Sequence, residues 1–201
     1  MIHFHKILKY ELNPKDVNVF TYLSDVISQK NDPPSLEQNK LELIGSIVFH
    51  SPLRRAVECI RKIKGVKYIP LKELAEIPFD LNALCSQEEW GKERSVIVRR
   101  KFKKAFIEDK LLISRHEIWN QIEFVLSKCL LKNEASDISV VSHSFKLKLI
   151  EACIDSNKKI IKTPELINNY IFDDIKTFGF GEGFNLNILR GGTLEIINPD
   201  K

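Results

Sequence analysis

The stretch Ile47-Val-Phe-His-Ser-Pro-Leu-Arg-Arg-Ala-Val-Glu-Cys-Ile-Arg61 predicts a short buried strand that runs directly into a helix. Its first three residues form a compact apolar run with the composition of a strand. Ser51 is a good helix N-cap, and Pro52 stands where a first-turn proline costs nothing. Apolar residues then recur at helical spacing, up to a glycine suited to end the helix: Leu53, Ala56, Val57, Ile60, Ile63 and Gly65.

This pattern puts Arg55 in the first turn of the predicted helix. Unpaired backbone N–H groups and the helix dipole favour an anion at that end. An arginine there can add a forked, two-donor grip on a phosphate group. A first-turn arginine that simply faces water is the common alternative.

A second junction of the same kind occupies residues 137–151. An apolar strand over residues 138–141 leads to His143, and Ser144 is suited to cap a helix with apolar positions Phe145, Leu149, Ile150 and Cys153. Two strand-to-helix junctions, one with an arginine and one with a histidine, are what a phosphate site at the carboxyl edge of an α/β sheet needs.

With these residues in view, the chain resembles the histidine phosphatase (phosphoglycerate mutase-like) superfamily. Residues 51–56, Ser-Pro-Leu-Arg-Arg-Ala, look like the family's Ser-Pro-Leu-x-Arg-Ala segment, and residues 140–144 look like its second-histidine motif. Residues 71–79 are similar to its Leu-x-Glu-Ile-x-Phe segment. Where the family has an amino-terminal Arg-His-Gly, this chain has Phe4-His5-Lys6. The four segments follow the family's order over nearly the whole chain.

The resemblance implies a metal-independent phosphatase without a cofactor. His5 is then expected to attack phosphorus and form a phosphohistidine, with Arg55 and protonated His143 as donors to the phosphoryl oxygens. Glu76 is expected to protonate the leaving group, with Glu73 as the other candidate. Mutase activity is less expected, because no segment is recognisable as closing the site against water.

The first motif departs from the family pattern. Phe4 replaces an arginine that would bind phosphate, and Lys6 replaces a glycine. Lys6 or Arg54 is the expected substitute, so the expected phosphate-binding set is Lys6, Arg54, Arg55, His143 and Ser144. The alternative function is a catalytically weak or inactive member that binds a phosphorylated ligand or protein partner.

Two further features carry weaker hypotheses. Alternation along the first strand puts His3 and His5 on one face, as in a metal-binding pair, but no third ligand lies nearby in the sequence, and no metal site is expected. The basic run at residues 99–104 is most simply a solvated helix face, and contact with nucleic acid is the less favoured reading.

Composition sets the broad class. The chain has 201 residues, of which 43% are hydrophobic and 29% charged, and its formal net charge is +4. These values fit a globular protein with an anionic small-molecule substrate. A phosphorylated small molecule or a phosphoprotein is the partner that the resemblance implies, and a homodimer is compatible with it. Four scattered cysteines indicate buried thiols in a reducing compartment. No signal peptide or membrane span is recognisable, so a cytoplasmic protein is expected.

The expected fold is α/β, with three α/β/α layers around a mainly parallel, phosphoglycerate mutase-like sheet. We expect one domain over residues 1–201 with a mostly helical insertion at about 86–132, read as two helices with Ser114 capping the second. Two apolar runs, at residues 184–189 and 193–197, predict a terminal hairpin.

Overall fold

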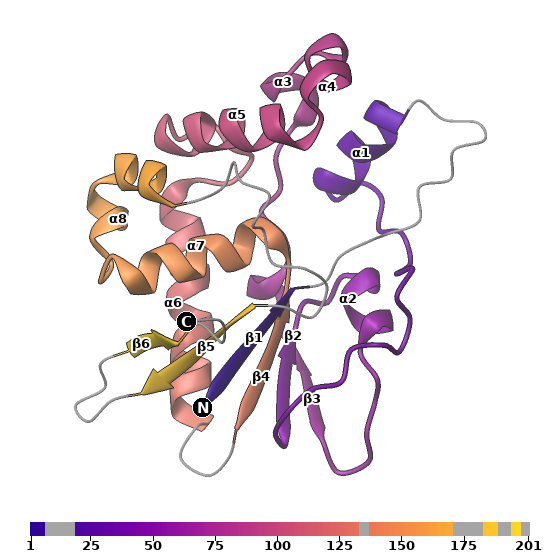
Figure 1. The fold of residues 1–201 in the computed structure, drawn as a ribbon, viewed down its shortest axis with the longest axis vertical. Coiled ribbons are helices and arrows are strands. Elements are labelled where there is room, and N and C mark those ends of the chain that lie inside the picture. Colours follow the sequence, from indigo (N-terminus) through magenta and orange to yellow (C-terminus); the bar gives the residue numbers. More distant parts are fainter. Residues whose placement is uncertain (7–18, 133–136, 171–182, 189–193, 198–201) are drawn as a thin grey trace.

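Among the described residues, six strands form one mixed sheet, which lies in the lower half of the view in Figure 1. The computed structural model describes residues 1–6, 19–132, 137–170, 183–188 and 194–197. The spatial order is β3-β2-β4-β1-β5-β6, in which the first four strands are parallel and β5 is antiparallel to both of its neighbours. The strands are β1 (Ile2–Lys6), β2 (Ile47–His50), β3 (Lys67–Pro70), β4 (Ile138–Ser142), β5 (Gly183–Ile188) and β6 (Leu194–Ile197).

Helices pack on the sheet and above its carboxyl edge. They are α1 (Val19–Ile27), α2 (Arg54–Cys59), η1 (Lys72–Leu74), α3 (Leu81–Leu84), α4 (Gln87–Glu93), α5 (Ser95–Ile107), α6 (Arg115–Lys132), α7 (Ser144–Asp155), α8 (Lys159–Lys162) and η2 (Pro164–Asn169). The predicted α/β class with a mainly parallel sheet is therefore confirmed.

Alternation along the strands separates two apolar clusters. Val48 and Val141 point to the α2 side, where they meet Ala56 of that helix. Phe49 and Val140 belong to the larger cluster, which continues into α5, α6 and α7. Within it, aromatic rings from three segments meet in one group: Phe79, Phe102 and Phe145. This group fixes the start of α7 against the helices above the sheet.

The helix α2 is shorter than predicted. It begins at Arg54, after Leu53 rather than Ser51, and ends at Cys59. The chain leaves the helix at Ile60 because residues 39–41 run alongside it: the N–H of Leu41 donates to the carbonyl oxygen of Cys59 at 2.9 Å. Helical spacing alone cannot reveal such a competing backbone partner.

Other sequence expectations have mixed outcomes. The terminal hairpin is confirmed as the antiparallel pair β5–β6, although its loop lies outside the described residues. Ser114 accepts the N–H of Glu117 at 3.1 Å and caps α6, as predicted. The first of the two helices predicted there is divided into α4 and α5, because Arg94 adopts a left-handed φ of 52°. All four cysteines are buried and free.

Candidate functional site

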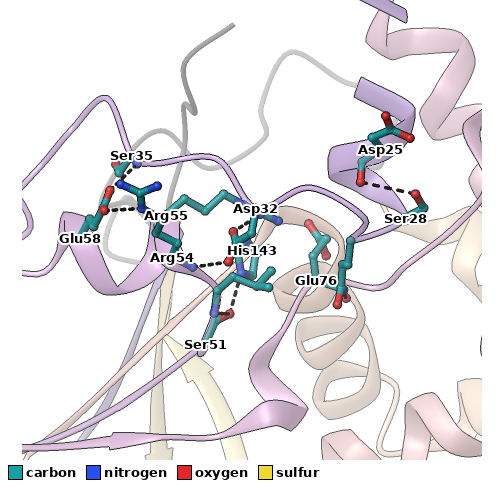
Figure 2. A network of polar contacts seen from close by, with 12 residues as sticks. Asp25, Ser28, Asp32, Ser35, Ser51, Arg54, Arg55, Glu58, Glu76 and His143 are labelled. Atoms are coloured by element: carbon teal, nitrogen blue, oxygen red, sulfur yellow. Dashed lines mark hydrogen bonds and ion pairs between the residues drawn. The ribbon is translucent and has the colours of Figure 1, made fainter. Parts of the chain in front are cut away.

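The two strand-to-helix junctions meet at the carboxyl ends of β2 and β4. These strands are neighbours, with His50 opposite Val141 in the register, and the N–H of Ser51 donates to the carbonyl oxygen of Val141 at 3.0 Å. This link continues the pairing one residue past β2. It brings the hydroxyl of Ser51 to 2.9 Å from Nε2 of His143, and both residues are buried (Figure 2).

Arg55 reaches the same place from α2. Its side chain is only 8% exposed, which is unusual for an arginine. The positive charge lies close enough to disfavour protonation of His143 and to favour ionisation of Glu76. The three predicted residues Arg55, His143 and Glu76 therefore lie in one electrostatic neighbourhood, although they come from segments far apart in the chain.

Glu76 lies just after η1 and binds the amino-terminal end of α7. One carboxylate oxygen accepts the N–H of Lys146 at 2.9 Å, and the other accepts the N–H of Phe145 at 3.2 Å. Burial raises the pKa of Glu76, while these backbone hydrogen bonds and the charge of Arg55 oppose the rise. A carboxyl group with a raised pKa beside an anion site has the property that a general acid needs.

The surroundings of His143 favour its neutral imidazole form. Burial lowers the pKa of His143 well below its ordinary value, and the charges of Arg55 and Lys146 lower it further. Burial and the two nearby cations therefore disfavour protonation of His143 in the ligand-free site, and its protonation beside a phosphoryl group stays a prediction. The Nδ1–H tautomer lets Nε2 accept the proton of the Ser51 hydroxyl, whose oxygen also accepts the N–H of Leu53 at 3.2 Å.

Lys146 is a member of this neighbourhood that sequence reasoning missed. Its side chain is fully buried, and Nζ donates to Oε1 of Gln121 at 2.7 Å. Burial lowers the pKa of Lys146 to about 8, with Glu76, Glu73 and Glu117 opposing the change. The available signal was spacing: position 146 falls on the buried stripe of α7 with Leu149, Ile150 and Cys153.

His5 lies at a different level of the sheet from His143. In the register of β1 and β4 it lies opposite Val141, whereas His143 follows Ser142, which is opposite Lys6. Nε2 of His5 lies 3.5 Å from the hydroxyl of Ser139, toward the amino-terminal end of β4. The register therefore sets the backbone of His5 short of the level of His143, and the role of His5 as nucleophile stays a prediction.

The remaining predicted ligands occupy different surroundings. Lys6 is buried as the last residue of β1, on the opposite face of the strand from His5. Arg54 turns outward, and its Nε donates to Glu58 at 2.6 Å. Ser144 is the first helical residue of α7 and not its cap. That position belongs to His143, and the carboxylate of Glu76 satisfies the first-turn N–H groups instead.

Glu76, and not Glu73, is the carboxylate at this helix start. Glu73 lies in η1, where its negative charge acts on Lys146. The choice between the two glutamates could not be made from spacing alone, because it depends on which one faces α7.

The lowered pKa of His143 is expected to make the protein less stable in acid. In the unfolded chain this imidazole titrates near its ordinary pKa of 6.5, whereas the folded protein resists protonating it. As pH falls below about 6.5, the unfolded state binds the extra proton and the free energy of unfolding decreases. Urea unfolding of wild type and His143→Gln at pH 7.5 and 5.0 measures this effect. We expect a smaller loss in the variant, and equal losses would contradict the assignment.

The buried ammonium of Lys146 is expected to cost stability. A drop in pKa from 10.5 to about 8 corresponds to about 3 kcal/mol against folding at neutral pH. Lys146→Met loses the hydrogen bond to Gln121, so we expect a net gain of about 1–2 kcal/mol in the free energy of unfolding. The gain is expected to shrink between pH 8 and pH 10.5, as the wild-type lysine loses its proton in the folded state.

Lys104→Met is the matched control, because the Lys104 side chain is 76% exposed on α5. It should change the free energy of unfolding by less than about 0.5 kcal/mol. A destabilised Lys146→Met variant would show that the ammonium contributes more through its contacts than burial costs.

Within the described ranges, no group of three or more His, Cys, Asp or Glu side chains has the arrangement of a metal site. Over the same residues, no helix has the length and apolar character needed to cross a membrane.

Comparisons with known proteins give a likeness in structure but none in sequence. No family model matches the chain, and no curated protein matches its sequence. Among solved structures, the chain is similar to a mutant phosphoserine phosphatase from Entamoeba histolytica in complex with phosphoserine. That match has 16% sequence identity and a TM-score of 0.48, and it covers 98% of this chain and 93% of the other. Neither family nor activity follows from a likeness at this level, so the histidine phosphatase resemblance stays a prediction.

Proposed function

We propose that the protein binds phosphomonoesters at the site formed by Arg55, His143 and Ser51. The observation that carries this proposal is the guanidinium of Arg55: it is almost fully buried and donates from Nη1 to a carboxylate oxygen of Asp32 at 3.0 Å. A buried arginine that already holds an anionic group is suited to a phosphoryl group, which offers more oxygens and more charge than a carboxylate.

The neighbouring groups support a phosphoryl ligand. Burial and two cations lower the pKa of His143 in the ligand-free site, and an anion close to its ring would raise that pKa by favouring the imidazolium form. Binding would then be accompanied by proton uptake at this ring. A partly buried site also strengthens each charged hydrogen bond relative to water. The ligand class is a phosphorylated small molecule or a phosphoprotein.

Hydrolysis of the bound phosphomonoester is the second candidate function, and Glu76 favours it. Its raised pKa suits proton donation to the oxygen of a leaving alcohol as the P–O bond breaks. By resemblance to histidine phosphatases, the acceptor of the phosphoryl group would be Nε2 of His5. That step requires the imidazole to move away from Ser139 toward His143. Water would then release phosphate from the phosphohistidine, with Glu76 as the base.

Two measurements test these proposals separately. Isothermal titration calorimetry with inorganic phosphate tests binding, and two buffers of different ionisation enthalpy reveal the proton taken up. Binding that is lost in Arg55→Ala is expected. Heat of dilution alone with both folded wild type and folded Asp32→Asn, which lacks the carboxylate at Arg55, would overturn the proposal.

Hydrolysis is tested with a panel of phosphomonoesters and four proteins: wild type, His5→Ala, His143→Ala and Glu76→Gln. If His5 is the nucleophile, label from a ³²P-phosphorylated substrate remains on wild type after denaturation and is absent from His5→Ala. Binding without turnover across the panel would support the binding function alone. Turnover that is unchanged in His5→Ala would exclude a phosphohistidine at His5. The Glu76→Gln variant would then test whether Glu76 takes part in hydrolysis.

A further inference from the structure

Residues 32–35, in the segment between α1 and β2, lie against the start of α2 and bind its buried arginine, Arg55. Oδ1 of Asp32 accepts from Nη1 of Arg55 at 3.0 Å, and Oδ2 accepts the backbone N–H of Arg54 at 2.6 Å (Figure 2). The two oxygens of the Asp32 carboxylate thus accept hydrogen bonds from two adjacent residues at the start of α2. The site that we assign to a phosphoryl group already holds an anion supplied by the chain itself.

The same segment is attached to α2 a second time. The N–H of Ser35 donates to Oε2 of Glu58 at 3.0 Å, and Glu58 also holds the side chain of Arg54 at 2.6 Å. Between the two attachments stand Pro33 and Pro34, whose rings restrict the backbone. The segment is therefore a short, stiff strap fixed to the helix by Asp32 on one side and Ser35 on the other.

Exposure differs between the two partners of the Asp32 ion pair. The side chain of Arg55 is 8% exposed, whereas that of Asp32 is 34% exposed. Arg55 therefore belongs to the protein interior, while the carboxylate reaches it from the solvent side. This is the direction from which a soluble ligand would also approach. A ligand phosphoryl group and the Asp32 carboxylate would compete for the same guanidinium, and two anions at one arginine repel each other.

We propose that Asp32 is an internal competing anion, so that ligand binding at Arg55 requires release of the Asp32 strap. This inference rests on the proposed phosphomonoester-binding function and adds its regulation. The ligand-free site is held closed, and its apparent affinity is the intrinsic affinity reduced by the fraction of molecules in which the carboxylate has left Arg55. An interaction that pulls residues 31–36 away from α2 would raise the affinity without touching the ligand.

The test compares Asp32→Asn with wild type by calorimetry with inorganic phosphate. Asparagine keeps an oxygen that can accept the Arg54 N–H but removes the charge that competes for Arg55. We expect phosphate to bind about ten-fold more tightly to this variant. Glu42→Gln is the matched control: it also neutralises a carboxylate paired with an arginine, but its partner is the exposed Arg61 just after α2, and the affinity should stay within about two-fold.

A second measurement follows the strap itself in wild type. Amide hydrogen exchange in a peptide that covers residues 29–40 should become faster when phosphate saturates the protein, because the strap is released. Asp32→Ser, which also keeps a neutral acceptor, repeats the affinity test if the asparagine variant folds poorly.

The outcomes separate this inference from the function beneath it. Tighter binding in Asp32→Asn together with faster exchange in wild type supports the strap. Phosphate binding that is equal or weaker in Asp32→Asn, or exchange that is unchanged at saturation, overturns the strap and leaves the binding function in place. Phosphate that binds to none of the folded proteins overturns both.

Discussion

Replacing Arg55 with alanine is expected to weaken binding of inorganic phosphate by about 100-fold. A charge-assisted hydrogen bond at a buried site is worth about 1.5–3 kcal/mol, and every 1.4 kcal/mol is a factor of ten in the dissociation constant. The side chain is almost fully buried and lies beside His143 and Glu76, so bulk water does not replace the guanidinium as a donor to phosphate. Calorimetric titration with phosphate measures the loss. The affinity of Arg55→Lys should lie between those of wild type and Arg55→Ala, because lysine keeps the charge but lacks the forked pair of donors.

Arg54→Ala is the matched control for this change. Both residues are arginines at the start of α2, but the side chain of Arg54 is 59% exposed and is bound to Glu58. We expect phosphate affinity to change by less than about three-fold, since exposed charges contribute little. Equal losses in both variants would mean that the helix end attracts phosphate through general positive charge, and would contradict a specific site at Arg55.

Replacing Glu76 with alanine is expected to lower the free energy of unfolding by about 3 kcal/mol. The carboxylate is the acceptor for three backbone N–H groups, those of Ile77, Phe145 and Lys146. Each partly buried donor left without an acceptor costs about 1–3 kcal/mol, and water replaces part of the loss. The buried ammonium of Lys146 also loses a favourable negative charge. Chemical unfolding of wild type and variant at pH 7.5 measures the difference.

Glu76→Gln and Glu73→Ala complete the test of this carboxylate. Glutamine keeps one acceptor oxygen and removes the charge that burial disfavours, so it should lose less stability than alanine does. Glu73→Ala removes a nearby carboxylate that does not cap α7, and we expect a change below about 1 kcal/mol. A Glu73 variant as unstable as Glu76→Ala would contradict the assigned role of Glu76.

The residues that local pattern could predict are those at strand-to-helix junctions. Apolar runs followed by helical spacing give β2, α2, β4 and α7, and neighbouring parallel strands end at one edge of a sheet. Arg55 and His143 therefore come together as the sequence predicts. Local pattern alone does not distinguish Glu76 from Glu73, and the resemblance to a known family selected Glu76.

The position of His5 relative to His143 depends on strand register, which the sequence alone does not determine. The first strand contains two histidines at alternating positions, and the motif suggested His5 as the residue at the edge. Pairing of Lys6 with Ser142 instead sets His5 two residues short of the level of His143. A shift of two residues along a strand is about 6.6 Å, so the imidazole has to swing toward the edge of the sheet to reach a phosphoryl group there. Such pairing is a long-range property and has no local signature.

Asp32 was missed for a related reason. It lies in a segment with no periodicity, and its importance comes only from contact with Arg55, more than twenty positions along the chain. The capping of α7 is similar, because Ser144 looks like a cap in sequence, whereas Glu76 supplies the oxygens from another segment. Side chains that act across the fold on backbone N–H groups cannot be found from spacing within one element.

The most direct test of phosphate recognition is a crystal structure of the protein soaked in tungstate, a heavy analogue of phosphate with a strong anomalous signal. An anomalous peak with oxygens about 3 Å from Nη1 of Arg55, beside His143 and with the carboxylate of Asp32 moved away, is the expected result. A well-diffracting soaked crystal in which tungstate lies elsewhere and Asp32 still holds Arg55 would contradict it.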